Sequence, residues 1–181
     1  MVMLIRSVAI VLALLAAGDY SNTQAGVNCE IQSSVTELDF ALLTKGYTCL
    51  TFERSTYGYH LLHIWHKDKM LRFLVDTGSP FNAPDKARTA HLDLVWNFKR
   101  HYVDSSTGTY TVDTCKLNEI QIQSHMLKEI EFIARDFEKN NDGMAAAGES
   151  KIDGLLGIPF LRANKAVIDC ARSRIYLKVK K

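Results

Sequence analysis

The sequence predicts an all-β domain, and three observations indicate this class. Two largely apolar runs, at residues 59–65 and 70–75, are joined by the polar residues 66–69, which is typical of a β-hairpin. Apolar and polar residues alternate at 120–122 and again at 130–132, as expected for half-buried strands. Patterns that favour helices are confined to short segments, so strands are expected to form the core.

The length and charge of the chain limit the classes of function. Its 181 residues suit one domain with extensions and a core of ordinary size. The formal net charge of +2 is small, and no basic stripe with interleaved aromatic residues is present. We therefore expect no nucleic-acid partner.

The first 25 residues have the pattern of a secretory signal peptide. Arg6 precedes a continuous apolar run at 8–17, polar residues follow, and residues 23–25 fit a cleavage site with small side chains. A membrane anchor needs about 20 apolar residues, and the polar pair 18–19 ends this run well before that length. We expect cleavage after Ala25, export to the periplasm or the medium, and no stable membrane anchor afterwards.

Residues 26–57 form an N-terminal extension that carries no catalytic pattern, and the main domain is expected at 58–181. A short capped helix is predicted at 36–43, with Gly46 as its end. A strand is expected at 49–53.

Two later segments outside the strands also have recognisable patterns. Residues 84–91 begin with a proline at a first-turn position, which predicts a short helix. Residues 138–151 are rich in Gly, Asn and Ala, which predicts a long loop that is mobile or functional.

Four cysteines remain in the chain after the expected cleavage: Cys29, Cys49, Cys115 and Cys170. In an exported protein this number suggests two disulfides, with three possible connectivities. A Cys29–Cys49 bridge would tie the extension to itself, and a Cys115–Cys170 bridge would join two core strands. The alternative is four buried thiols. No Cys-x-x-Cys motif indicates a zinc or redox site.

The apolar run at 70–75 stops at Asp76-Thr77-Gly78, followed by Ser79 and a proline. A carboxylate at the end of a buried strand is costly unless other groups hold it. Thr77 offers a hydroxyl, Gly78 permits a tight turn, and the next two residues prevent the strand from continuing. The pattern presents one acid at the tip of a rigid element; the alternative is an ordinary turn with an Asx cap.

Three histidines, His60, His63 and His66, recur at every third position and invite comparison with a metal site. On a strand His63 faces away from the other two, so the three cannot converge on one ion. We therefore expect no metal here.

The Asp76 motif resembles the active-site loop of aspartic proteases, and a second motif far downstream strengthens the resemblance. Residues 153–161, Asp-Gly-Leu-Leu-Gly-Ile-Pro-Phe-Leu, resemble the family element in which a glycine lets a second strand approach the Asp loop. Residues 166–169 and 175–177 resemble the closing strands. The resemblance covers about residues 57–181. It is to the single-domain, retropepsin-like branch of the family, and specifically to the exported bacterial members of that branch. It implies a half-barrel with short helices after each motif.

The resemblance implies an aspartic endopeptidase, a hydrolase without a cofactor. Such enzymes use two carboxylates that share one proton, one as general base towards water and one as hydrogen-bond donor to the carbonyl. This chain has one motif, so the second Asp76 would come from another copy in a symmetric homodimer. Thr77 would bond across the dimer axis, and Gly78 would place its N–H near the carboxylates.

The resemblance also assigns substrate-binding residues. Ser79 would hydrogen-bond the outer carboxylate oxygen. Residues 104–112 match in position the flap hairpin that closes over substrate, with Gly108 and Tyr110 near its tip, although an ordinary hairpin is the alternative.

Two positions depart from the retroviral pattern, in which an acid after the motif pairs with an arginine after the downstream glycine. Here these positions hold Pro80 and Ile158, so any dimer is expected to be weak. The first alternative is a monomeric, catalytically inactive domain that binds peptide or protein. A further alternative is a small disulfide-tied envelope protein with structural contacts only.

Overall fold

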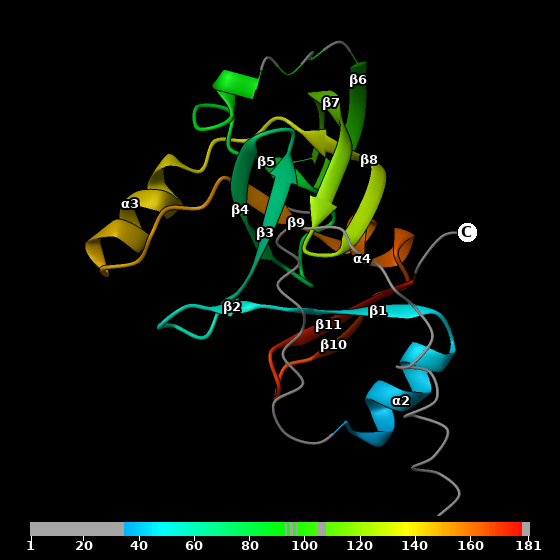
Figure 1. The fold of residues 1–181 in the computed structure, drawn as a ribbon. Coiled ribbons are helices and arrows are strands. Elements are labelled where there is room, and N and C mark those ends of the chain that lie inside the picture. The colour runs from blue at the N-terminus through cyan, green and yellow to red at the C-terminus, as the bar shows by residue number, and fades with distance from the viewer. Residues whose placement is uncertain (1–34, 93, 95, 97, 105–107, 179–181) are drawn as a thin grey trace, which may run out of the picture.

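The computed structural model describes residues 35–92, 94, 96, 98–104 and 108–178 (Figure 1). Its helices are α2 (Glu37–Thr44), a 3₁₀ helix (Ala90–Leu92), α3 (Glu138–Ala146) and α4 (Ile158–Ala163). Its strands are β1 (Tyr47–Thr51), β2 (Glu53–Arg54), β3 (His60–His66), β4 (Lys69–Val75), β5 (Ala83–Pro84), β6 (Phe98–Asp104), β7 (Gly108–Ile122), β8 (His125–Ile133), β9 (Gly154–Leu156), β10 (Val167–Asp169) and β11 (Arg174–Lys178). The predicted all-β class with a few short helices is confirmed.

The larger sheet has eight strands, in the order β5-β9-β4-β3-β7-β6, with β2 beside β3 and β8 beside β7. The predicted hairpin is present as β3 and β4, which pair antiparallel with Leu62 opposite Phe73. Successive side chains of a strand point to opposite faces, and Leu62, Ile64, Leu71 and Phe73 are buried on one of them. The side chains on this face form part of the main core, and their packing holds β4 in place up to the residue before Asp76.

β9 lies parallel to β4, with Phe73 opposite Gly154, and antiparallel to the short β5. A Cβ at position 154 would lie 2.4 Å from the Ala83 carbonyl oxygen and 2.6 Å from a ring carbon of Phe73. Only glycine allows the three chain segments to approach this closely. The tight packing brings the end of β9 beside the end of β4.

The smaller sheet has the order β1-β11-β10 and lies below the larger one (Figure 1). β1 pairs antiparallel with β11 from Tyr47 opposite Lys178 to Thr51 opposite Arg174. Buried side chains from both strands, including Leu50 and Leu177, join the main core. The N-terminal segment is thus hydrogen-bonded to the last described strand.

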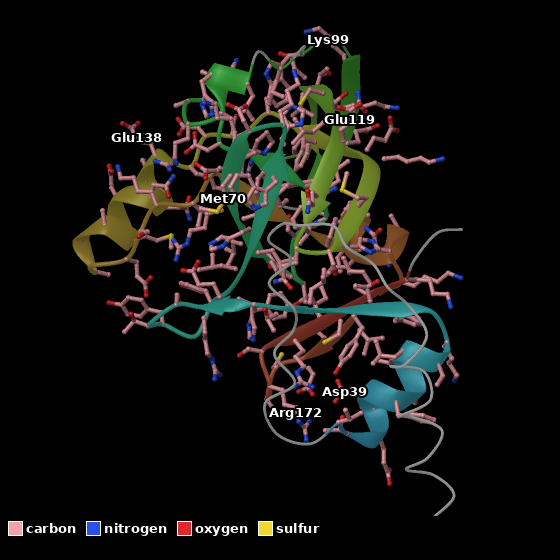
Figure 2. The ribbon with its side chains drawn as sticks, viewed as in Figure 1. Asp39, Met70, Lys99, Glu119, Glu138 and Arg172 are labelled. Carbon is pink, nitrogen blue, oxygen red and sulfur yellow. The ribbon has the colours of Figure 1, made fainter. Side chains whose placement is uncertain are left out.

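Helix α2 begins with the predicted cap, because Thr36 accepts a hydrogen bond from the Asp39 N–H and Asp39 bonds back to the Thr36 N–H. Asp39 is the buried residue of this helix, and it lies between α2 and the smaller sheet (Figure 2). Its carboxylate accepts hydrogen bonds from Arg174 at 2.7 and 2.8 Å and from the Tyr176 hydroxyl at 2.7 Å. An ion pair therefore joins α2 to β11.

The helix predicted at 84–91 is wrong in most of its length. Pro84 lies in β5, opposite Gly154, because a proline at the edge of a sheet needs no donor. The Asp85 carboxylate caps the next turn by accepting from the Ala87 N–H at 3.0 Å and the Arg88 N–H at 3.3 Å. Only Ala90–Leu92 forms a helix, of the 3₁₀ type.

The long loop predicted at 138–151 is also wrong, because its first part is helix α3. Asn141 of this helix is buried, and its amide group donates to the Asp85 carboxylate at 2.9 Å and to the Ile152 carbonyl at 3.0 Å. Its oxygen accepts from the Ile152 N–H at 2.8 Å. These distant contacts stabilise a helix that its composition does not favour.

The expected Cys115–Cys170 disulfide is wrong. Cys115 is a free thiol buried in β7 of the larger sheet, whereas Cys170 is a free, exposed thiol just after β10 of the smaller sheet. Burial raises the pKa of Cys115 to about 12. Cys29 lies outside the described residues, so the Cys29–Cys49 bridge stays a prediction.

The predicted signal peptide at 1–25 lies outside the described residues, and its cleavage stays a prediction. In the part of the chain that the structure describes, no helix has the length and apolar character needed to cross a membrane.

Candidate active site

Asp76 follows β4 directly and is half-buried. Its N–H donates to the Leu156 carbonyl oxygen at 2.9 Å, which continues the parallel pairing of β4 with β9 by one residue. The backbone of Asp76 is thus fixed by the sheet although the residue stands outside it. This is the rigid presentation of a carboxylate that the sequence predicts.

A tight turn surrounds the Asp76 carboxylate. The Gly78 N–H donates to Asp76 Oδ1 at 2.8 Å, and the Ser79 N–H donates to the Asp76 carbonyl at 3.3 Å. A Cβ at position 78 would lie 3.3 Å from Oδ1, a distance tighter than most real contacts. Gly78 therefore supplies an amide donor to the acid, and both Thr77 and Gly78 are exposed beside it.

Ser79 is buried, and its hydroxyl is bonded within its own loop. Oγ donates to the Phe81 carbonyl at 2.8 Å and accepts from the Phe81 N–H at 3.3 Å. The Ser79 hydroxyl is thus hydrogen-bonded to the Phe81 backbone. A contact of Ser79 with the Asp76 carboxylate or with substrate stays a prediction.

The downstream glycine, Gly157, packs against the Asp76 loop as the resemblance predicts. A Cβ at position 157 would lie 2.1 Å from the Phe81 carbonyl oxygen and 2.6 Å from that of Ser79. The next residue, Ile158, donates its N–H to the Ser79 carbonyl at 2.8 Å. A side chain at position 157 would therefore push the downstream motif away from the Asp76 loop. The predicted short helix follows Gly157 as α4.

One residue of the site escapes prediction from the sequence. Asn82, between Phe81 and Ala83, is 5% exposed, and its amide bonds to the backbone of both Gly157 and β8. The sequence shows only that one amide side chain lies within a largely apolar segment. This pattern does not predict its role, because its partners are 49 and 75 positions away.

The hairpin predicted near the site is present as β6 and β7, with Asp104 opposite Gly108 and Tyr102 opposite Tyr110. Its tip, 105–107, lies outside the described residues, and the side chain of Tyr110 is not described. The roles of Gly108 and Tyr110 at substrate stay predictions.

Two of the three histidines of β3 have separate polar partners. His63 contacts the Glu53 carboxylate at 2.6 Å, whereas His66 bonds the Asn118 carbonyl at 2.9 Å. Among the residues that the structure describes, no group of three or more His, Cys, Asp and Glu side chains is arranged to hold a metal ion.

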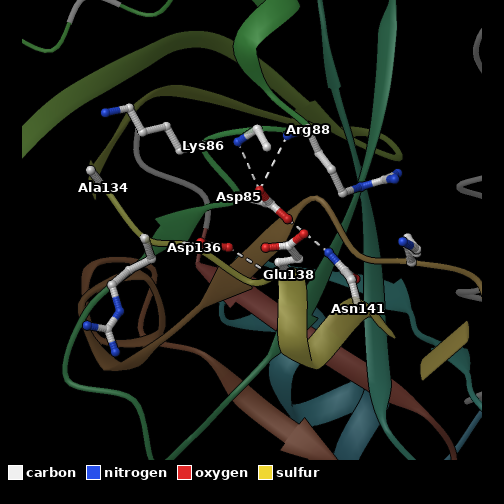
Figure 3. Close-up of a pocket in the computed structure, with 10 residues that line it drawn as sticks. Asp85, Lys86, Arg88, Ala134, Asp136, Glu138 and Asn141 are labelled. Atoms are coloured by element: carbon white, nitrogen blue, oxygen red, sulfur yellow. Dashed lines mark hydrogen bonds between the residues drawn. The ribbon is translucent and has the colours of Figure 1, made fainter. Parts of the chain in front are cut away.

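A pocket of about 640 Å³ lies away from Asp76, where Asp85 and Asn141 meet (Figure 3). Asp85 and Asp76 lie at opposite ends of β9. The Asp85 N–H donates to the carbonyl of Asp153, the residue just before β9, whereas the Asp76 N–H donates to the carbonyl of Leu156, the last residue of β9. The Asp85 carboxylate is occupied by the Ala87, Arg88 and Asn141 donors. The pocket is therefore separate from the Asp76 turn.

Comparison with known proteins gives one family match. The model of the family described as aspartyl protease matches residues 62–160, more than half of the chain. This region includes both motifs of the site.

The solved structures that are similar to the chain include two retropepsin-like domains. One is a retropepsin-like aspartic protease from Rickettsia conorii, with 19% identity, a TM-score of 0.49, and coverage of 72% of this chain and 90% of that one. The other is the retroviral protease-like domain of Ddi1 from Leishmania major, with 10% identity, a TM-score of 0.43, and coverage of 71% and 88%. No curated protein sequence matches the chain.

Proposed function

The chain belongs to the aspartyl protease family, and on this premise we propose that it is an aspartic endopeptidase. The observation that carries the proposal is the Asp76 turn, in which a half-buried carboxylate at the end of β4 accepts the Gly78 N–H at 2.8 Å. The substrate class is a peptide or protein, and no cofactor takes part.

The proposed reaction uses one Asp76 carboxylate as general base towards a water molecule. The second carboxyl is protonated and donates a hydrogen bond to the scissile carbonyl. Two carboxylates about 3 Å apart cannot both ionise, so they share one proton, as is general for aspartic proteases. The Gly78 N–H holds one carboxylate oxygen in place, which leaves the other oriented for the water.

The second carboxyl is proposed to come from another copy of the chain. Asp-Thr-Gly occurs once in the sequence, at 76–78. Thr77 and Gly78 are exposed beside Asp76, which suits contact with the same loop of a partner related by a two-fold axis. Because Pro80 and Ile158 replace the charged pair of the retroviral pattern, we propose a weak homodimer, with a dissociation constant on the order of micromolar.

Those two replacements favour a second candidate function, a monomeric and inactive domain that binds peptide. One experiment separates the two: cleavage of an unstructured protein between about pH 3 and pH 7, with and without pepstatin, by the chain that begins at Gly26. Cleavage that pepstatin blocks and that Asp76→Asn abolishes supports the enzyme. Peptide binding without cleavage at any pH would replace the enzyme by the binding domain.

We also propose that the protein is exported, on the basis of the apolar run at 8–17 and the cleavage pattern before Gly26. N-terminal sequencing of the protein recovered from the cell exterior or periplasm tests this. Recovery in the cytoplasm with an intact Met1 would contradict it.

A further inference from the structure

Asn82 connects three parts of the chain through one buried side chain. Its Oδ1 accepts from the Gly157 N–H at 2.9 Å and from the Phe160 N–H at 3.3 Å. Its Nδ2 donates to the Glu131 carbonyl of β8 at 3.1 Å. Both ends of the amide are therefore used, and only a group with one acceptor and one donor in this orientation satisfies all three backbone partners.

These bonds replace a helix cap that α4 does not have. Gly157 is the N-cap residue of α4, and it has no side chain with which to bond the first free N–H groups. A side chain at that position is excluded, because a Cβ would lie 2.1 Å from the Phe81 carbonyl oxygen. Asn82 supplies the missing acceptor from a different segment.

Gly157 lies between the two residues whose backbone contacts hold the Asp76 loop. On one side of Gly157, the Leu156 carbonyl accepts the Asp76 N–H at 2.9 Å. On the other side, the Ile158 N–H donates to the Ser79 carbonyl at 2.8 Å. A shift of Gly157 would move both contacts together, and with them the carboxylate.

We propose that Asn82 is a positioning residue for Asp76, acting through Gly157 and its two neighbours. The expected effect on catalysis rests on the proposed function, whereas the expected effect on the position of the Asp76 loop does not. Misplacement of a reacting group by about 1 Å can cost roughly a hundredfold in rate. Asn82 does not contact the reacting atoms, so its loss is expected to reduce kcat far more than it changes KM.

Asn82→Asp provides a test that a merely structural role would not pass. When the introduced carboxyl group is protonated it keeps the amide pattern, because its O–H can donate to the Glu131 carbonyl and its C=O can accept from the Gly157 N–H. When it is ionised it has only acceptors, so it faces the Glu131 carbonyl without a proton and carries a buried charge. The ratio of kcat for the variant to kcat for the wild type is therefore expected to fall as pH rises.

The matched control is Asn164→Asp. Asn164 is a buried asparagine at the other end of α4, 4% exposed, and its amide donates to the Phe160 carbonyl at 2.9 Å. This bond stays within the last turn of the helix and involves no residue of the Asp76 loop. We expect Asn164→Asp to lower the melting temperature and to keep the wild-type pH profile of kcat.

For Asn82→Asp we expect kcat near the wild-type value at the acid end and a loss of about tenfold or more at the upper end, with KM within about twofold. If the ratio of kcat values is independent of pH, or changes equally in the Asn164→Asp control, the positioning role is refuted.

A second measurement does not depend on activity. Hydrogen exchange of the Asp76, Ser79 and Gly157 amides reports whether the loop is held, and at neutral pH we expect faster exchange at all three in Asn82→Asp but not in Asn164→Asp. Unchanged exchange would refute the inference. A wild-type protein that cleaves nothing while these amides still respond would refute the proposed function alone.

Discussion

Replacement of Asp39 by alanine is expected to destabilise the protein strongly, although this residue is far from Asp76 in the sequence. The carboxylate accepts from Arg174 at 2.7 and 2.8 Å, from Tyr176 at 2.7 Å and from the Thr36 N–H at 2.8 Å. Its removal takes the Asp39 carboxylate away from a guanidinium that is 14% exposed and from a buried hydroxyl.

The size of the effect follows from the burial of this pair. Loss of one partner of a buried ion pair costs about 3–5 kcal/mol, whereas an exposed pair is worth about 0–1 kcal/mol. For a chain of this size each 1 kcal/mol lowers the melting temperature by about 2–4 °C, so a fall of about 10 °C is expected.

Urea and thermal unfolding of Asp39→Ala, wild type and Asp142→Ala measure the difference. Asp142 is the matched control, because it pairs with Lys151 at 3.2 Å from a helix while its side chain is 65% exposed. If Asp39→Ala lost no more free energy of unfolding than Asp142→Ala, the role of this ion pair would be refuted.

The contribution of Asp39 is also expected to depend on pH. Burial alone raises its pKa, but the hydrogen bonds from Tyr176, Thr36 and Arg174 outweigh burial and hold the pKa well below its usual range. A group whose pKa is lowered by folding contributes stability above its unfolded pKa and loses it as pH falls through the folded pKa. The stability difference between wild type and Asp39→Ala should therefore be full near neutral pH and shrink below about pH 4.

Three further predictions concern the site and the thiols. Asp76→Asn should reduce peptide cleavage by orders of magnitude while the melting temperature stays near that of the wild type, because the shareable proton is lost; unaltered cleavage would reject the assignment. Excess Asp76→Asn mixed with wild type should suppress activity, and wild-type specific activity should fall on dilution; constant specific activity in a monomer would exclude a shared site. Cys170 should react with a thiol reagent in the folded protein, whereas Cys115 should react only after unfolding, since it is fully buried and its pKa is raised to about 12; equal rates would contradict the burial.

Local patterns were sufficient to predict the elements that hold the site. The two apolar runs at 59–65 and 70–75, with polar residues between them, predict the β3–β4 hairpin, and the residues at 76–80 predict that the strand ends in a tight turn around one acid. Gly157 was recognised through the resemblance to a family. In each case, the residues that determine the structure are adjacent in the sequence or form a short motif.

The errors and the omission arose where distant contacts decide the structure. Asn82 bonds residues 49 and 75 positions away, and Asn141 stabilises α3 through Asp85, 56 positions away. The predicted Cys115–Cys170 bridge is wrong because a local sequence pattern does not show which sheet a segment joins, and the two residues belong to different sheets. Asn82 and Asn141 belong to common polar types whose roles appear only when their partners are known.

The pairing of β1 with β11 has a consequence for any shortened form of the protein. β1 covers one edge of β11, whose Ile175, Tyr176 and Leu177 are fully buried. A chain that began at residue 58 would leave that edge with unpaired N–H and C=O groups beside exposed apolar side chains, which is a template for pairing with other chains. Strand β1, which precedes the family-matched region, is thus expected to keep this edge from pairing with other chains.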